Sequence, residues 1–278
     1  MDELSIEPLE ARQRVKESSY TLALRDLLGG VNKASIWNIL GWQDIKQRYM
    51  RSVLGPFWLT ISSAILVAAL GVLYATLLGQ SIEEFIPHVA GGLLVWTFLS
   101  TMILEGCTVF IASEGIIKQI RLPLTVHVCR MVWRNVIIFL HNAVILLCVL
   151  YFVPEVDIAH LLTIPVAILV IAFNGIWIGI VLGVLCTRFR DIHQIITNFV
   201  QILFFLTPIF WKPELLQDRG WVANYNPAYH FIELVRSPLL GNGIPVFSWS
   251  VIMLLTVAGF ILAYFMLARY RHRVAYWL

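Results

Sequence analysis

Three cations, Lys46, Arg48 and Arg51, stand together in the stretch QDIKQRYMRSVLGPFW at positions 43–58. A Gly-Pro pair follows them, and the chain is then almost wholly apolar through residue 78. Cationic side chains beside a membrane attract anionic lipid headgroups at about 1 kcal/mol each. The cluster therefore predicts a positively charged protein surface at the membrane boundary. Fixing the orientation of the chain in the membrane would by itself explain these cations.

A second charged pair is expected inside an apolar hairpin. Glu105 precedes the turn near residues 118–120 by about as many positions as Arg134 follows it. In an antiparallel hairpin the two side chains would meet at similar depth, and an unpaired intramembrane carboxylate costs about 2.5–3.5 kcal/mol. We predict a structural ion pair between Glu105 and Arg134 rather than a transport or proton-relay role.

Catalytic constellations are missing from the sequence. It has no G-x-x-x-x-G-K-[ST] phosphate loop, no G-x-S-x-G nucleophile turn and no metal-ligand spacing among its four cysteines. His193, in CTRFRDIHQ, lies among arginines and is expected to be a surface residue. We expect no catalytic residue, no metal and no cofactor in this chain, and any energy from ATP must come from a partner protein.

The elements that carry these residues are membrane spans. The chain is 59% hydrophobic and 13% charged, with mean hydropathy +0.80, against about 45–50% and about 25% in soluble domains. A helix needs about 20 apolar residues to cross a hydrocarbon core of about 30 Å. The sequence predicts an all-α integral membrane protein with six transmembrane helices, at 56–78, 86–104, 135–153, 161–186, 195–211 and 248–268.

Charge sets the predicted orientation. Seventeen of the 20 Lys and Arg residues fall on the side of the membrane that holds both termini, and the opposite short loops are acidic. Positive loops stay in the cytoplasm, so both termini are expected there. No run resembling a cleavable signal peptide occurs in the first fifty-five residues.

The predicted organisation has four parts. A cytoplasmic segment (1–35) precedes an amphipathic helix (36–54) in the plane of the interface, a permease domain (55–270) contains the spans, and a cytoplasmic tail (271–278) follows. The apolar positions that repeat along the interface helix are Ile39, Trp42, Ile45, Tyr49 and Val53.

Two loops of the permease domain have sequence features typical of folded elements. The basic loop 112–126 is either a docking helix for a cytoplasmic protein or a loop that only obeys the orientation rule. The long outer loop, 212–247, has Pro213 and Pro227 where helices can begin, Asn226 as a cap, and Phe231 on a repeating apolar face. We predict two short re-entrant helices there, between the fifth and sixth spans.

Four motifs in order resemble one family. WQDIKQRYMRSVLGPFWLTI, TRFRDIHQI, FLTPIFWKPE and YNPAYHFIELVRSPLLG are similar to the membrane subunits of bacterial polysaccharide ABC exporters, the Wzm-like type 2 permeases for O-antigen, capsule and teichoic acid. The resemblance runs from about residue 33 onward. It departs at Trp42-Gln43, which precede Asp44 where the family often has Arg.

The resemblance implies a homodimer in the bacterial inner membrane with two cytoplasmic Wzt-like ATPase subunits, which would bind ATP and Mg²⁺. Together they would move an undecaprenyl-diphosphate-linked polysaccharide, O-antigen first among the glycans, to the periplasm, with no nucleic acid involved. By position, the residues that it assigns to ATPase coupling are Glu114, Lys118 and Arg121, and those of the periplasmic gate are Pro213, Asn226, Pro227 and Phe231.

Within this framework a diphosphate headgroup would meet the opening cluster, because Arg binds phosphate bidentately. The expected headgroup residues are Lys46, Arg48, Tyr49 and Arg51. Aromatic rings offer sugars flat apolar faces, and the conduit candidates are Trp58, Tyr74, Phe98, Phe204 and Phe205. The alternatives are a permease of the same fold for a smaller lipid, a drug or haem, and a membrane enzyme of glycolipid assembly.

Overall fold

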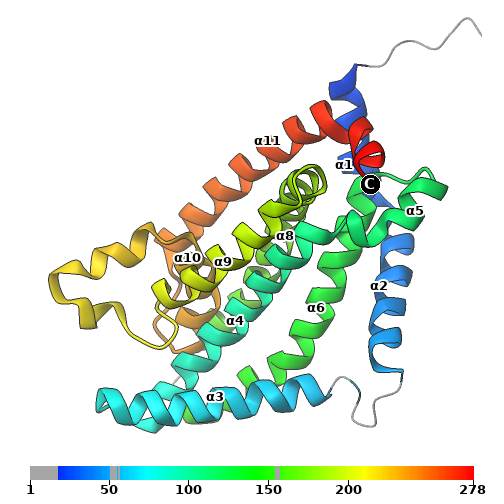
Figure 1. Cartoon of the computed structure of the whole chain (residues 1–278). Coiled ribbons are helices and arrows are strands. Elements are labelled where there is room, and N and C mark those ends of the chain that lie inside the picture. The colour runs from blue at the N-terminus through cyan, green and yellow to red at the C-terminus, as the bar shows by residue number, and fades with distance from the viewer. Residues whose placement is uncertain (1–17, 51–54, 56, 154–156) are drawn as a thin grey trace, which may run out of the picture.

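The computed structural model describes residues 18–50, 55, 57–153 and 157–278, with the backbone alone at 216–218. Within these ranges every regular element is a helix, as the all-α prediction expected (Figure 1). The elements are α1 (Ser19–Asn32), α2 (Ala34–Tyr49), α3 (Phe57–Leu78), α4 (Ile82–Thr108), η2 (Ile111–Ser113), α5 (Glu114–Gln119), α6 (Leu124–Val149), η3 (Leu150–Phe152), α7 (Ile158–Leu161), α8 (Thr163–Arg188), α9 (Asp191–Leu206), η4 (Pro213–Tyr225), α10 (Pro227–Leu239) and α11 (Val246–Trp277).

Five of the described helices are long and apolar enough to cross a membrane: α3, α4, α6, α8 and α11. The chain is therefore a multi-pass membrane protein. The span predicted at 195–211 corresponds to α9, which has 16 residues and so reaches about 24 Å at 1.5 Å per residue. It ends early because Thr207 precedes Pro208 and takes an extended conformation, φ −87° and ψ 135°, as residues before proline prefer.

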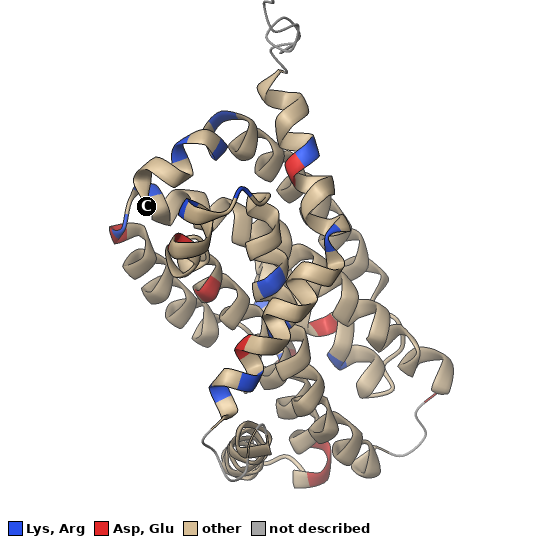
Figure 2. Ribbon diagram, turned by 90° about the vertical axis from the view of Figure 1, so that its right-hand side faces the viewer, with Lys and Arg blue, Asp and Glu red and all other residues tan. Residues whose placement is uncertain are grey.

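Helix α4 is the centre of the bundle. It contacts α3, α6, α8, α9 and α10, and most of its side chains are buried. The approach to α8 depends on glycine: a Cβ added to Gly106 would lie 3.1 Å from the Cα of Gly179. Small residues let membrane helices approach this closely. Close packing matters because there is little hydrophobic driving force for helix association in lipid. By contrast, α3 lies at the periphery (Figures 1 and 2), with only Val67, Gly71 and Ala75 buried.

The amino-terminal helices brace the bundle from outside. Helix α1 contacts α6 and α11, and Arg271 of α11 donates to the Leu22 carbonyl at 2.8 Å. Asp26 caps α6 from a distance: its carboxylate accepts from the Leu124 and Thr125 backbone N–H groups, both at 3.1 Å, and from the Thr125 hydroxyl at 2.9 Å. Helix α1 thereby holds the first turn of α6, just after α5.

Helix α2 covers the start of the predicted interface helix (36–54) and packs along α6. Its Asn38 accepts a hydrogen bond from the Trp133 indole at 2.9 Å. The predicted apolar face is split, because Ile39 and Trp42 are exposed whereas Ile45 is buried against the protein. The predicted member Val53 lies outside the described residues.

The outer loop forms helices at the predicted points. Pro213 is the first residue of η4 and Pro227 the first of α10, and the Asn226 side chain caps α10 by accepting from the Ala228 N–H at 3.0 Å. Phe231 is buried. These helix starts and the cap are confirmed, and the two helices lie at the end of the molecule opposite α5 and the C-terminus (Figure 1).

Candidate functional site

A cavity of about 430 Å³ lies between α2, α3, α4 and α6. We call it the α2–α6 cavity. It brings together four residues predicted from the sequence, Arg48 and Tyr49 from the headgroup cluster and Trp58 and Phe98 from the conduit candidates. They reach it from three helices: Arg48 and Tyr49 lie at the end of α2, Trp58 at the start of α3 and Phe98 on α4. The cavity is the strongest candidate site in the described part of the chain.

The two headgroup residues in the cavity differ in their setting. Arg48 is exposed, whereas the Tyr49 hydroxyl is buried and has no hydrogen-bond partner among the described residues. Burial raises the pKa of Tyr49 above 10.0, and the nearby Arg48 guanidinium offsets this only in part. Tyr49 is therefore neutral at physiological pH and able to donate a hydrogen bond. Lys46 is exposed and does not line the cavity, and Arg51 lies outside the described residues.

Behind the cavity a charged network joins three helices. Arg134 of α6 donates to Glu105 of α4 at 2.7 Å and to Asp44 of α2 at 3.0 Å. Arg130, one turn earlier on α6, donates to the same Asp44 carboxylate through its Nε at 2.7 Å. The predicted partners Glu105 and Arg134 thus lie together, as part of a larger set.

Asp44 and Arg130 were not predicted from the sequence as members of this network. Asp44 is close in sequence to the cations Lys46 and Arg48. These neighbours were the obvious partners, whereas its actual partners lie on a helix far along the chain. A usable signal was present: Arg130 and Arg134 are spaced i, i+4 and therefore share one helix face. Asn135 completes the set by donating to Glu105 at 2.6 Å.

The remaining conduit candidates form a separate aromatic group. Tyr74 stacks on Phe210 with ring centroids 5.0 Å apart, and Phe204 contacts both Phe205 and Phe210 at 5.3 Å. Phe205 is exposed. The structure therefore divides the five predicted conduit residues between two places, with Trp58 and Phe98 in the α2–α6 cavity and the other three in this aromatic group.

The predicted coupling residues lie at the end of the molecule that holds the C-terminus (Figure 1). Glu114 and Lys118 form an exposed i, i+4 ion pair on α5 at 2.6 Å, and Arg121 just after α5 is also exposed. Figure 2 shows Lys and Arg gathered at this same end. Helix α5 contacts η2 and α11, and none of its residues is buried.

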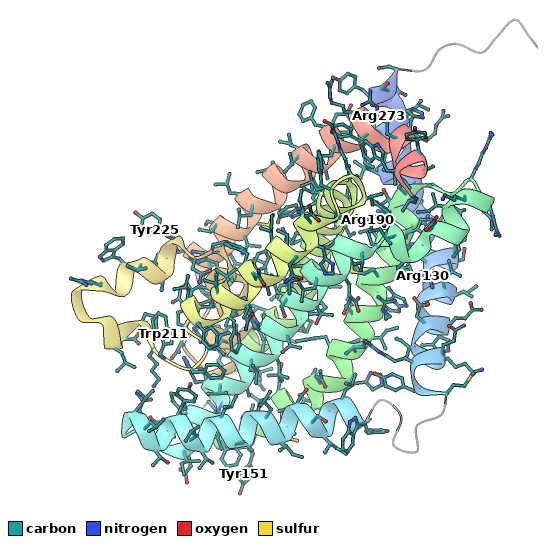
Figure 3. The ribbon with its side chains drawn as sticks, viewed as in Figure 1. Arg130, Tyr151, Arg190, Trp211, Tyr225 and Arg273 are labelled. Atoms are coloured by element: carbon teal, nitrogen blue, oxygen red, sulfur yellow. The ribbon has the colours of Figure 1, made fainter. Side chains whose placement is uncertain are left out.

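A second cavity, of about 610 Å³, lies at the opposite end, beside α10. The predicted gate residue Pro213 lines it, together with Arg236, which is 2% exposed. The Arg236 guanidinium donates to Glu233 at 2.9 Å and to the Pro208 carbonyl. Burial, together with Glu233, raises the pKa of Tyr229 to about 12. Figure 3 shows Trp211 and Tyr225 projecting from this end.

The comparisons with known proteins converge on one family. The family described as ABC-2 type transporter matches residues 36–240. An O-antigen export system permease protein RfbA of Klebsiella pneumoniae is 24% identical over 222 residues, which cover 79% of this chain and 85% of the relative. One of Myxococcus xanthus with the same name is 23% identical over 178 residues, covering 64% and 68%. A further Klebsiella pneumoniae protein of that name is 22% identical over 222 residues, covering 79% and 85%.

Proposed function

Because the chain belongs to the ABC-2 type transporter family, we propose that it is the membrane subunit of an ATP-driven exporter for a lipid-linked polysaccharide. Its relatives are named as O-antigen export permeases, and an O-antigen-type glycan on undecaprenyl diphosphate is the proposed cargo. In this role the chain is a transporter subunit rather than an enzyme. Its proposed location is the bacterial inner membrane.

The observation that carries the proposal is the α2–α6 cavity, where Arg48 and the unpaired Tyr49 hydroxyl stand beside the start of α3. A guanidinium at a membrane surface binds phosphate through paired, charge-assisted hydrogen bonds. In the proposed mechanism the diphosphate docks at Arg48, with Lys46 and Arg51 adding to the positive field. The glycan then follows the aromatic rings of Tyr74, Phe204 and Phe205.

The proposed topology has six crossings. Helix α9 is the fifth crossing along the chain and α11 the sixth. The short length of α9 is completed by the segment after Thr207, and η4 and α10 form a re-entrant gate at the periplasmic side. An even number of crossings returns both termini to the cytoplasm, and the positive end that carries α5 and the C-terminus suits that side (Figure 2). The gate would be built from Pro213, Asn226, Pro227 and Phe231.

The proposed assembly is a homodimer with two cytoplasmic ATPase subunits of the Wzt-like type, which bind ATP and Mg²⁺. Membership of the family supports a partner ATPase. The exposed helix α5, with Glu114 and Lys118 on its surface, is the proposed coupling element, joined by Arg121. The field of nearby cations would attract an acidic surface on the ATPase.

A gene deletion tests this function. Cells that lack the chain should accumulate finished, lipid-linked polymer on the cytoplasmic side and lose it from the surface. A glycolipid-assembly enzyme would behave differently, because its loss should abolish the polymer itself. Normal surface polysaccharide in the deletion strain would refute the export role.

A further inference from the structure

The interior of the α2–α6 cavity holds polar groups in addition to the cation Arg48. Asn142 is 7% exposed, and its Oδ1 has no hydrogen-bond partner among the described residues. The same is true of the Tyr49 hydroxyl. A buried polar atom normally has a hydrogen-bond partner, and a buried atom without one destabilises the folded state. Both atoms lie in residues that line one cavity, so a ligand in it would satisfy them together.

Polar groups face each other across this cavity. On α6, Asn135 and Asn142 are spaced i, i+7 and share a helix face. On α4, Thr97 and Thr101 are spaced i, i+4, and their hydroxyls donate to the Leu93 and Thr97 carbonyls at 2.8 and 2.7 Å. With their protons engaged, these threonine oxygens act toward the cavity as acceptors. The walls therefore offer both acceptors and donors to a ligand with many hydroxyl groups.

The charged residues at and near the α2–α6 cavity argue against an ionic ligand in its interior. Among the residues that the structure describes, Arg48 is the only charged one that lines the cavity. The nearby cations Arg130 and Arg134 are engaged by Asp44 and Glu105, so they leave no free positive charge for a second anion. A lipid tail fits equally poorly, because it would bury Asn142 and Tyr49 without hydrogen bonds. The chemistry favours a neutral, hydroxyl-rich group.

Aromatic rings give the cavity its apolar walls. Phe98 and Phe139 pack with centroids 4.8 Å apart, and Trp58 stands at the α3 side. Flat ring faces of this kind pack against the apolar face of a sugar ring. The volume, about 430 Å³, falls in the range of about 300–1,000 Å³ found for small-molecule sites.

We propose that the α2–α6 cavity is a sugar subsite, which binds a neutral pyranose ring next to the diphosphate of the lipid-linked cargo. The ring hydroxyls bond to Asn142, Tyr49 and Thr101, while the diphosphate remains at Arg48. This inference rests on the proposed function and adds a selectivity for the first sugar unit. The carrier lipid alone would then be a weaker ligand than the glycosylated one.

The test uses the complex of this chain with its ATPase in lipid nanodiscs. Two probes are compared: undecaprenyl diphosphate bearing one neutral hexose, and undecaprenyl diphosphate without sugar. The measured quantity is the concentration of each probe that half-maximally stimulates ATP hydrolysis. In the unmodified complex the hexose probe should act at a concentration at least about tenfold lower, as expected for two or more net hydrogen bonds.

The variant Asn142→Leu removes the unpaired amide oxygen and keeps a side chain of similar size. It should cut the advantage of the hexose probe by about tenfold and leave the response to the sugar-free probe unchanged. If that variant fails to assemble, Thr101→Val is the second test. Thr76→Val is its matched control, because the Thr76 hydroxyl donates to the Val72 carbonyl at 2.8 Å in the same i, i−4 geometry on the exposed face of α3.

Each outcome decides one question. An unchanged hexose advantage in both cavity variants would mean that the cavity holds only water or lipid, and the subsite would be refuted. Equal potency of the two probes in the unmodified complex would refute it as well, with the export function intact. No response to either probe would instead count against the proposed function itself.

Discussion

The Nη2 atom of Arg134 lies 2.7 Å from the Glu105 carboxylate, and this contact ties α6 to α4 in the half of the bundle that leads to α5. The second nitrogen of the same guanidinium binds Asp44 of α2 at 3.0 Å. A planar fork with donors on two sides can hold two carboxylates at once, which an ammonium cannot do with the same geometry. One side chain therefore sets the relative position of three helices.

Replacing Arg134 should destabilise the chain. Arg134→Leu leaves Glu105 and Asp44 without one of their cations, and because these groups are about a quarter exposed or less, the expected loss is about 2 kcal/mol. The apparent melting temperature of the purified chain in detergent measures it. Arg134→Lys should recover only part of the loss.

A charge swap at the same pair gives a sharper result. Glu105→Arg with Arg134→Glu restores the pair but sets the carboxylate introduced on α6 against Asp44. We therefore expect incomplete rescue of folded yield, and full rescue only when Asp44→Asn is added. Full rescue by the double swap alone would show that Asp44 contributes nothing.

The cap that Asp26 provides to α6 should contribute more to the stability of the fold than an ordinary surface cap. Asp26 is 5% exposed and accepts three hydrogen bonds, so Asp26→Ala should cost about 1–3 kcal/mol. Asp157→Ala is the matched control, because Asp157 caps the short helix α7 through a single bond at 2.9 Å and is exposed. Thermal unfolding of both variants is the measurement, and equal losses would contradict the role of α1 as a brace.

Neutralising the headgroup cluster should affect substrate response and not assembly. Arg48→Ala with Arg51→Ala removes charge-assisted bonds to phosphate, and we expect at least about a tenfold rise in the lipid-linked substrate concentration that stimulates ATP hydrolysis. Gel filtration of the complex checks that assembly is intact. The control is Arg190→Ala, an exposed arginine before α9; the same loss there would indicate a general effect of charge.

Arg236 should be indispensable to the packing of α10. It is 2% exposed and satisfies both the Glu233 carboxylate, which is 16% exposed, and the Pro208 carbonyl. Arg236→Leu leaves both acceptors without this partner and is expected to cost about 2–3 kcal/mol. Arg236→Lys should not restore stability, since an ammonium cannot reproduce both contacts. Thermal unfolding is the measurement, and the partly exposed Lys212, which lines the same cavity, provides the control as Lys212→Ala. A variant at 236 as stable as this control would contradict the assignment.

Local physics made much of the fold predictable from the sequence. Long apolar runs must become helices in lipid, because only a helix satisfies its backbone groups within one segment. Pro213 and Pro227 marked helix starts, and Asn226 marked a cap, because their preferences depend on neighbours in the chain. The order of four motifs was enough to identify the family, whose match covers residues 36–240.

Only the tertiary structure decided which distant residues meet. Asp44 and Arg130 are 86 positions apart, and no periodicity within one helix could pair them. The aromatic candidates looked alike in the sequence, yet Trp58 and Phe98 share a cavity while Tyr74 and Phe204 belong to a different cluster. The physical reason is that composition and period fix what a helix is and which residues share its face, whereas the packing of one helix against another selects the partner for each face.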